Sequence, residues 1–433
     1  MRVLMVGFGQ ALLARLGADL PPGSVTILED PDLIAKRAVA AAAATLPCVG
    51  SVVAAPYHQS DAFLDALDRR DGLDGRDGLD GQDGLDGRDG FDAVIPALEY
   101  AVPAAAAAAE RLGRPGAGTK AAAALSDKIV LREVTEAAGI ATPRWREVGA
   151  AADVAAFAAG GAGGREIVLK PANRHASLGV RILAPGEDTT GAWADTVAAR
   201  DDILLPDRPL RWRYLVEERV LGDEVSVEAI VARGEPRFLN ITAKRVLPGP
   251  YPIETGHLLP APLPPGPQAA LAAAMRELIG AIGFGHGILH AEWMLPAGAP
   301  GVPVLIECAG RIPGDSIVEL IDLAYGTNLA RELLRTLGGE EPDLPAQATA
   351  GAAIRFLTAA PGRVAAVRGD AAARAVPGVR RVAVAVAPGG HVVPVRSSWD
   401  RVGEVLATGP DAGAAWAAAN AAAGQVTVTV TDR

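Results

Sequence analysis

The chain has 433 residues and a formal net charge of −10, with 50% hydrophobic and 4% aromatic residues. At about 150 residues per domain, this length predicts about three domains, each large enough to bury a core. The acidic charge argues against a nucleic-acid-binding surface, because such domains are usually basic.

The cysteine content and the short apolar runs bear on the compartment. Cys48 and Cys308 lie far apart and lack metal-ligand spacing. A disulfide framework is therefore not expected, which favours a reducing cytoplasm. The apolar N-terminus is too short for a signal peptide, and the alanine-rich runs are far shorter than the ~20 residues of a membrane span. We predict a cytoplasmic protein without membrane contact.

The first 115 residues alternate short apolar strands with helical stretches. This alternation predicts a small parallel α/β, Rossmann-like domain. The G-x-G turn at Gly7 and Gly9 could bind a phosphate at a helix N-terminus. A third glycine is missing at the usual place, so a simple tight turn is favoured. The expected strands are Val3–Val6, Val25–Leu28, Val49–Ala54 and Ala93–Pro96.

A tandem Asp-Gly repeat, DGLDGRDGLDGQDGLDGRDG, occupies residues 71–90. Glycine costs backbone entropy and the aspartates repel one another, so the repeat predicts a flexible surface loop. The D-x-D spacing raises the alternative of a calcium site. The ligand order of an EF-hand and its closing glutamate are absent, which favours the loop.

Replacing residues 71–90 with a short Gly/Ser linker should leave the activity of the protein unchanged. Loop length costs little entropy, and the repeat carries no visible chemistry. Comparison of specific activity and melting temperature with the parent chain checks this. A folded variant that has lost activity would show that the repeat is functional.

Residues 126–139 predict a helix that begins at an N-cap Ser126, has Asp127 in its first turn and stops at Gly139. Lys128 falls in the first turn, where the helix dipole does not favour a cation. It is either incidental or held there by an anion.

A second lysine ends a short apolar strand, Ile167–Leu169. Lys170 is followed by a polar loop with Ser177 and Gly179, and then by a strand at Val180–Leu183. Such a loop can hold phosphates through its backbone N–H groups and the ammonium. The order of a Walker A loop is absent, and a plain hairpin turn is the alternative.

The segment 214–231, YLVEERVLGDEVSVEAIV, predicts two strands around a turn at 221–223. Between the strands, a linker with unpaired backbone groups could pair with an adenine edge, and a nearby carboxylate could accept ribose hydroxyls. The alternative is a plain charged hairpin.

Two apolar runs around a Pro/Gly-rich turn, within residues 288–308, predict a β-hairpin. Glu292 and Glu307 would lie opposite each other, with Cβ atoms roughly 4.5–5.5 Å apart. Two bare carboxylates this close repel unless a cation lies between them, and Mg²⁺ fits such oxygen ligands. Arg311 follows and could bind a phosphate through its planar fork. A solvated hairpin with an ordinary ion pair is the alternative.

In type, order and spacing, these motifs resemble the ATP-grasp superfamily over about residues 1–345. The resemblance implies an ATP-grasp fold of the α/β (α+β) class. It implies an N-terminal parallel α/β domain at 1–115, an ATP-grasp domain at 116–345 with a lid at about 143–216, and a small C-terminal α+β domain at 346–433.

The resemblance also implies roles for individual residues. Arg311 would stabilise the transferring phosphoryl group as the catalytic residue, and Glu292 and Glu307 would bind Mg²⁺, with Mn²⁺ as a substitute. The ATP-binding set would be Lys128, Lys170, Ser177, Glu217, Glu218, Val220 and Glu224. In this set the lysines hold phosphates, Glu218 and Val220 pair with adenine through their backbones, and Glu224 meets the ribose.

One departure points to a branch of the superfamily. Many members have Asn two residues after the second glutamate, where this chain has Ala309, and the sequence ECAGR looks more like the L-amino acid ligases. Glu254 and His257 resemble an E-x-x-H of these dipeptide-forming enzymes, in which the acid meets the substrate ammonium and the histidine lies near the reacting carboxyl. A carboxylate is the expected partner for an ammonium.

The resemblance therefore implies an ATP-dependent carboxylate–amine ligase that acts through an acyl phosphate, with Arg311 also contacting substrate. Its partners would be a small-molecule carboxylate and an amine, the latter an amino acid, and a homodimer is allowed. A carboxylase that uses carboxyphosphate and a nucleotide-binding regulatory module without turnover are the alternatives. The substrates themselves depend on pocket shape.

Overall fold

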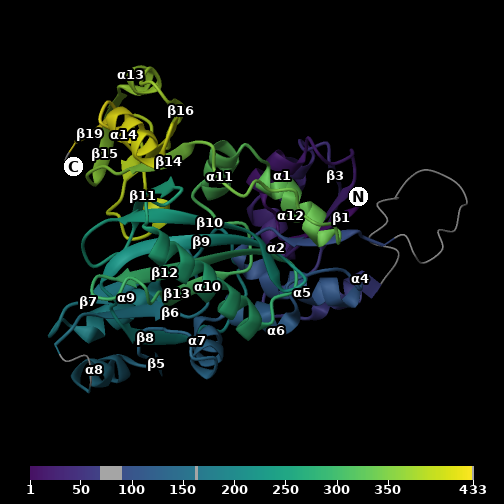
Figure 1. Ribbon diagram of the computed structural model, residues 1–433, viewed down its shortest axis with the longest axis horizontal. Helices are drawn as coiled ribbons and strands as arrows, with labels where there is room; N and C mark the ends of the chain where they lie inside the picture. Colours follow the sequence, from purple (N-terminus) through teal and green to yellow (C-terminus); the bar gives the residue numbers. More distant parts are fainter. Residues whose placement is uncertain (69–89, 161–163, 432–433) are drawn as a thin grey trace, which may run out of the picture.

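The computed structural model describes residues 1–68, 90–160 and 164–431. Four β-sheets organise the chain, with the helices packed on their faces (Figure 1). Apart from Gly90, the Asp-Gly repeat that we predicted as a loop lies outside the described residues. Within these ranges, every helix falls short of the length or apolarity needed to cross a bilayer.

The first sheet is parallel throughout, in the order β3-β2-β1-β4, which confirms the predicted parallel α/β arrangement. Its strands match the predicted ranges to within one residue. They are β1 (Val3–Val6), β2 (Val25–Glu29), β3 (Val49–Ala54) and β4 (Ala93–Pro96). The helices around it are α1 (Gln10–Leu16), α2 (Pro31–Lys36), α3 (Val39–Ala43), α4 (Ala62–Asp68), η1 (Glu99–Ala101) and α5 (Val102–Arg111).

The glycine turn after β1 is occupied by a side chain of the protein itself. The backbone N–H of Phe8 donates to Oε2 of Glu29 at 2.8 Å, and Glu29 is fully buried at the end of β2. Nη1 of Arg37 lies 3.5 Å from the same carboxylate oxygen. A carboxylate of the protein therefore already accepts a hydrogen bond from the backbone of this turn, which favours the tight-turn interpretation over phosphate binding.

The second sheet is antiparallel, in the order β5-β8-β6-β7. Its strands are β5 (Trp145–Val148), β6 (Ile167–Pro171), β7 (Arg181–Leu183) and β8 (Tyr214–Glu218). Helices α8 (Ala151–Ala159) and α9 (Thr189–Ala198) accompany it, and α6 (Thr119–Ser126) and α7 (Lys128–Ala137) precede it.

The predicted N-cap of α7 was wrong by one residue. Oδ1 of Asp127 accepts from the backbone N–H groups of Ile129 and Val130, so Asp127 is the cap, and Ser126 is the last residue of α6. Asp127 has an extended backbone that separates the two helices. A carboxylate at this end also suits the helix dipole, which explains why the aspartate caps in preference to the serine.

The third sheet is the largest, in the order β13-β12-β9-β10-β11-β14-β18-β16, and all of its neighbouring strands are antiparallel. Its strands are β9 (Gly222–Ala232), β10 (Glu235–Val246), β11 (Glu254–Leu259), β12 (Gly287–Pro296), β13 (Val304–Ala309), β14 (Gly351–Leu357), β16 (Val379–Val384) and β18 (Gly403–Gly409). Helices α10 (Pro265–Ile282), α11 (Ile317–Tyr325) and α12 (Leu329–Leu337) pack on it.

The strands after residue 350 divide between two sheets. Strands β14, β18 and β16 continue the large sheet, so this part of the chain shares its sheet with the centre of the molecule (Figure 1). The fourth sheet has the order β17-β15-β19, with β15 (Gly362–Arg368), β17 (His391–Val392) and β19 (Thr427–Thr431). Helix α14 (Ala412–Ala423) packs on β14 and β18 of the large sheet, and α13 (Asp370–Arg374) contacts β16 and α14. The short turn η2 (Ser398–Asp400) lies between β17 and β18.

Two apolar clusters fix the large sheet in place. On one face, residues of α11 and α12 pack with the first sheet and with β9 and β14 in a single cluster. On the other face, α6, α7 and α10 cover β9 and β12, where Trp293 is fully buried. Packing on both faces leaves β9 buried along most of its length.

Candidate active site

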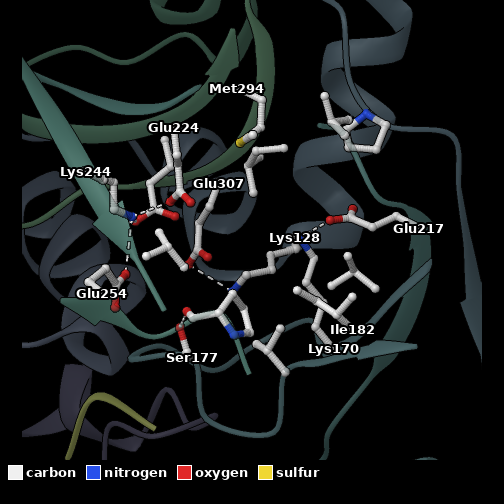
Figure 2. Close-up of a pocket in the computed structure, with 18 of the residues that line it drawn as sticks. Lys128, Lys170, Ser177, Ile182, Glu217, Glu224, Lys244, Glu254, Met294 and Glu307 are labelled. Carbon is white, nitrogen blue, oxygen red and sulfur yellow. Dashed lines mark hydrogen bonds and ion pairs between the residues drawn. The ribbon is translucent and has the colours of Figure 1, made fainter. Parts of the chain in front are cut away.

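A cavity of about 450 Å³ lies between the second sheet and the large sheet. Figure 2 shows side chains from both sheets pointing into it. Every residue predicted to bind ATP or metal lines it, together with Glu254 and Arg311, whereas His257 does not. The sequence-predicted residues are therefore gathered at one place, with one exception.

The predicted opposition of the two glutamates is confirmed. Glu292 on β12 pairs in register with Glu307 on β13. Each carboxylate has its own lysine, because Nζ of Lys244 lies 2.7 Å from Glu292 and Nζ of Lys128 lies 2.9 Å from Glu307. These two ammonium groups offset the repulsion that a shared cation was expected to relieve.

Lys244, on β10, is the central cation of the site and was missed by the sequence analysis. Its buried ammonium lies 2.7 Å from Glu224, 2.7 Å from Glu292 and 3.3 Å from Glu254 (Figure 2). Burial alone would lower the pKa of Lys244, but the three carboxylates outweigh it and raise that pKa well above its ordinary value. The one available signal was a lysine within an otherwise strand-like run.

A buried network holds Glu292 from behind. Nδ1 of His290 lies 3.0 Å from Glu228, and its Nε2 lies 3.4 Å from Glu292. Both partners are carboxylates, which only accept hydrogen bonds when ionised, so both ring nitrogens of His290 carry protons. Despite burial, the two carboxylates raise the pKa of His290 to about 9. Burial opposes the ionisation of Glu292, but Lys244 and His290 hold its pKa well below the ordinary value. The carboxylate is therefore kept anionic.

Lys170 is held by a buried ion triad. Its ammonium contacts Oε1 of Glu217, and Nη2 of Arg132 lies 2.9 Å from Oε2 of the same carboxylate. Arg132 also donates to the carbonyl of Ile306 on β13 at 2.7 Å. Burial raises the pKa of Glu217, but the two cations outweigh it and lower that pKa. The Glu217 side chain, predicted to contact ATP, is thus engaged in positioning Lys170.

Lys128 is held by anionic and polar groups rather than being incidental. It is the first residue of α7, and its ammonium contacts Glu307 and the carbonyl of Arg174, the latter at 2.7 Å. It therefore bridges the β13 carboxylate and the loop between β6 and β7.

That loop folds over the cavity with two residues in left-handed conformation, Ala176 and Ser177, at φ +57° and +55°. The Ser177 hydroxyl donates to the carbonyl of Pro252 at 3.1 Å, which ties the loop to the segment before β11. Since such φ values are uncommon outside glycine, the surrounding contacts fix this conformation.

The connection between β8 and β9 offers backbone groups and an apolar wall. Among the described residues, no turn, loop or cap backbone hydrogen bond engages Val220. The Glu218 carboxylate accepts from Nε of Arg144 at 2.9 Å, so its side chain is already paired. The nearby lining residues Val168, Ile182, Met294 and Ile306 provide apolar surface.

Glu254 and His257 both lie on strand β11. Residues three apart on a regular strand face opposite sides. A register shift pairs Glu254 with Val246 and His257 with Lys244, so the extra residue Thr255 returns both side chains to one face.

The two side chains nevertheless have different surroundings. The Glu254 carboxylate accepts from the hydroxyl of Ser398 at 2.9 Å and also contacts Lys244. His257 is buried outside the cavity lining, with Nε2 3.1 Å from Asp315, which is paired in turn with Arg401. His257 was expected near the reacting carboxyl, but its side chain does not line the cavity.

Arg311 lies beyond β13, and its Nε donates to Oε2 of Glu99 at 2.7 Å. Glu99 comes from the turn η1 after the first sheet and was not predicted. The contact joins the first sheet to the cavity.

The carboxylates of Glu292 and Glu307 suit a hard cation whose remaining ligands are supplied by water and a bound phosphate. In residues 1–68, 90–160 and 164–431, no group of three or more His, Cys, Asp or Glu side chains has a metal-binding arrangement. Mg²⁺ in phosphate sites is commonly bound through one or two carboxylates, with waters and substrate phosphates as the other ligands. The opposed Glu292 and Glu307 supply such a pair.

Two known domain families match the chain. Residues 164–319 match the ATP-grasp domain, and residues 355–431 match the L-amino acid ligase C-terminal domain 2. The first match covers strands β6, β7 and β8 of the second sheet and the strands that carry Glu292 and Glu307. The second covers the C-terminal strands and the loop with Ser398 and Arg401.

Individual proteins are similar over part or all of the chain. An uncharacterized protein, y4rH, of Sinorhizobium fredii is 29% identical over 68% of this chain and 59% of its own length. The alanine–anticapsin ligase of Bacillus subtilis is 27% identical over 59% of this chain and 56% of its own length. This chain therefore spans less than two thirds of these relatives. The fold is also similar to the crystal structure of an L-amino acid ligase from Bacillus licheniformis, with a TM-score of 0.75 and 18% identity. The similarity covers 100% of this chain and 99% of that chain.

Proposed function

Because the chain carries an ATP-grasp domain followed by an L-amino acid ligase C-terminal domain, we propose that it is an ATP-dependent carboxylate–amine ligase. The enzyme joins a carboxylate to the amine of an amino acid and releases ADP and phosphate. The observation that carries this proposal is the single cavity that gathers Lys128, Lys170, Arg311 and the opposed Glu292 and Glu307.

In the first step, an oxygen of the substrate carboxylate attacks the γ-phosphorus of ATP. The new O–P bond forms as the bond to the β,γ-bridging oxygen breaks, which gives an acyl phosphate and ADP. Lys128 and Lys170 hold the phosphates, and Arg311 bears the developing charge on the transferring group. Adenine lies against the apolar wall at Val168 and Met294 and pairs with the Val220 backbone.

In the second step, the neutral amine of the second substrate attacks the acyl carbon. The C–N bond forms, the C–O bond to phosphate breaks, and the leaving phosphate takes up the proton that the nitrogen loses. Glu254 holds the amine substrate through its ammonium before deprotonation. The loop over the cavity, closed by Ser177, keeps water from the acyl phosphate.

Glu292 and Glu307 would hold Mg²⁺, or Mn²⁺ in its place, and the ion would neutralise phosphate charge and polarise the P–O bonds when bound. In this assignment Lys244 keeps Glu292 ionised in the free enzyme, and Lys128 is the counter-ion of Glu307. Lys244 then supports Glu224 at the ribose and Glu254 at the amine. Glu217 acts through Lys170 rather than on the nucleotide.

We also propose how the parts of the chain divide these tasks. The lid predicted at about residues 143–216, which corresponds to the sheet β5-β8-β6-β7, lies over ATP. The C-terminal segment from residue 346 on closes the substrate end through Ser398. The free thiols Cys48 and Cys308 are both buried, which supports a cytoplasmic location.

Phosphate release from ATP, measured with a panel of amino acids alone and in pairs, tests the function. Amino-acid-independent hydrolysis throughout the panel would contradict it.

Replacing Glu254 with Gln should raise the KM for the amine substrate about 10- to 100-fold. A charge-assisted hydrogen bond contributes roughly 1.5–3 kcal/mol, and 1.4 kcal/mol corresponds to tenfold. The Kd for ATP should stay close to that of the parent enzyme, because this carboxylate is not assigned to the nucleotide. Steady-state kinetics and ATP titration separate the two constants.

The matched control is Glu277→Gln on the exposed side of α10, which should change neither constant. An unchanged amine KM in the Glu254 variant would make this carboxylate merely structural. A weakened ATP Kd would instead assign it to the nucleotide site.

A further inference from the structure

One guanidinium in the cavity lacks the acidic partner that the neighbouring buried cations have. Arg174, in the loop after β6, lines the cavity and is 6% exposed. Its Nε and Nη1 are buried without a hydrogen-bond partner in the described part of the chain. The guanidinium stacks on the ring of Trp212, with its carbon 4.6 Å from the ring centroid.

Four other cations that line the cavity each have an acidic partner. Lys128 pairs with Glu307, Lys170 with Glu217 and Arg311 with Glu99, and Lys244 contacts three carboxylates. Burying a charge without a counter-ion is costly, and burial lowers the pKa of Arg174 below its ordinary value. A positive charge held in a binding cavity at this cost points to an anion that the ligand supplies.

Asp201, an acid whose charge acts on Arg174, does not form an ion pair with it. Oδ2 of Asp201 lies 3.4 Å from Nε2 of His175 and accepts from the Tyr100 hydroxyl at 3.3 Å. Its Oδ1 accepts from the backbone N–H groups of Ile203 and Leu204. Both oxygens are therefore engaged elsewhere, and no ion pair with Arg174 is formed.

The position of Arg174 relates it to the reacting end of the cavity. Its carbonyl accepts from Lys128, whose ammonium contacts Glu307. Its side chain lies beside Trp212, and the ring of Tyr100 lies 6.4 Å from that of Trp212. Tyr100 follows Glu99, the partner of Arg311. Arg174 thus lies at the junction of the lid loop and the first sheet, next to Lys128.

The proposed reaction leaves one anion without an assigned partner. An amino acid that supplies its amine keeps its α-carboxylate throughout the reaction, and that carboxylate enters a cavity rich in glutamates. Arginine binds carboxylates through two parallel N–H···O bonds, which also fixes their orientation. The ammonium of the same substrate is assigned to Glu254, so a cation is required for its other end.

We propose that Arg174 binds the unreacted α-carboxylate of the amine-supplying amino acid and thereby selects amino acids over simple amines. This inference rests on the proposed ligase function. An acidic side chain of the substrate offers the same chemistry from a second source, and the phosphates of ATP are a different ligand. The experiment below separates these three.

The test compares the most active amino acid of the phosphate-release panel with the amide of the same amino acid. In the parent enzyme, the amide should have a KM about 10- to 100-fold higher, as expected for the loss of a charge-assisted pair. Arg174→Gln should raise the KM of the free acid by a similar factor and leave that of the amide unchanged. The control Arg200→Gln removes a neighbouring charge whose side chain is 79% exposed, and it should change neither value.

Each other outcome overturns the assignment. An equal effect of Arg174→Gln on acid and amide shows that the α-carboxylate is not its ligand. Loss of discrimination only between aspartate and asparagine assigns Arg174 to a side-chain carboxylate, and a weakened ATP Kd assigns it to phosphate. If Arg174→Gln does not fold, the KM values of the acid and the amide are compared in Arg174→Lys and in the parent enzyme. Equal KM values for acid and amide in the parent enzyme reject the proposal. Absence of any amide product in the parent enzyme rejects the ligase function itself.

Discussion

Replacing Glu307 with Gln should reduce ATP-dependent phosphate release on the order of a thousandfold while the fold stays intact. A metal ion supplies several kcal/mol of charge stabilisation to phosphoryl transfer, and each 1.36 kcal/mol is tenfold in rate. Glu307 is one of the two opposed carboxylates, and it is also the counter-ion of Lys128. Its neutralisation weakens the metal site and frees the lysine at the same time.

Phosphate release and melting temperature, both measured across a Mg²⁺ titration, check this result. The control Glu235→Gln makes the same change at an exposed position of the same sheet, at the start of β10, and should leave the rate unchanged. Release near the parent rate at physiological Mg²⁺ in the Glu307 variant would remove the opposed pair from the metal site.

Replacing Glu217 with Gln should lower the free energy of unfolding by about 3–5 kcal/mol. Breaking a buried ion pair by removing one partner leaves an uncompensated buried charge, which costs about this much. Here the change leaves two such cations, since Glu217 neutralises both Lys170 and Arg132. All three side chains are almost fully buried, so water cannot take the place of the carboxylate.

Urea denaturation, followed by circular dichroism, measures this change. The neighbouring variant Glu218→Gln is the matched control, because Glu218 pairs with the half-exposed Arg144 and such surface pairs contribute about 0–1 kcal/mol. If both variants lost the same small amount of stability, the triad would not be the element that holds Lys170 in the folded protein.

Much of the fold could be predicted because its signals are local. The strands of the first sheet are short apolar runs separated by helices, and the structure has them where the pattern indicates. The opposition of Glu292 and Glu307 followed from counting residues on either side of one turn. The N-cap of α7 was misassigned because Ser126 and Asp127 are both good caps, and the choice depended on where α6 ends.

Other features depend on contacts that no local pattern contains. Lys244 meets carboxylates from β9, β11 and β12, strands that become its neighbours only in the folded sheet. Glu254 and His257 share a face of β11 because of a bulge, which their spacing alone does not reveal. Arg174 is distinguished only by the acids that its neighbours have and it lacks. These residues needed the three-dimensional arrangement to be found.

The most direct test of the ligase function uses a substrate carboxylate labelled with ¹⁸O in both oxygens. The labelled acid, ATP, Mg²⁺ and an amine-supplying amino acid are incubated with the enzyme, and the products are analysed by mass spectrometry. An acyl phosphate route predicts one ¹⁸O atom in each phosphate released, with equal amounts of ADP and amide. Phosphate without label, or formation of pyrophosphate and of AMP that carries one ¹⁸O atom, would contradict it.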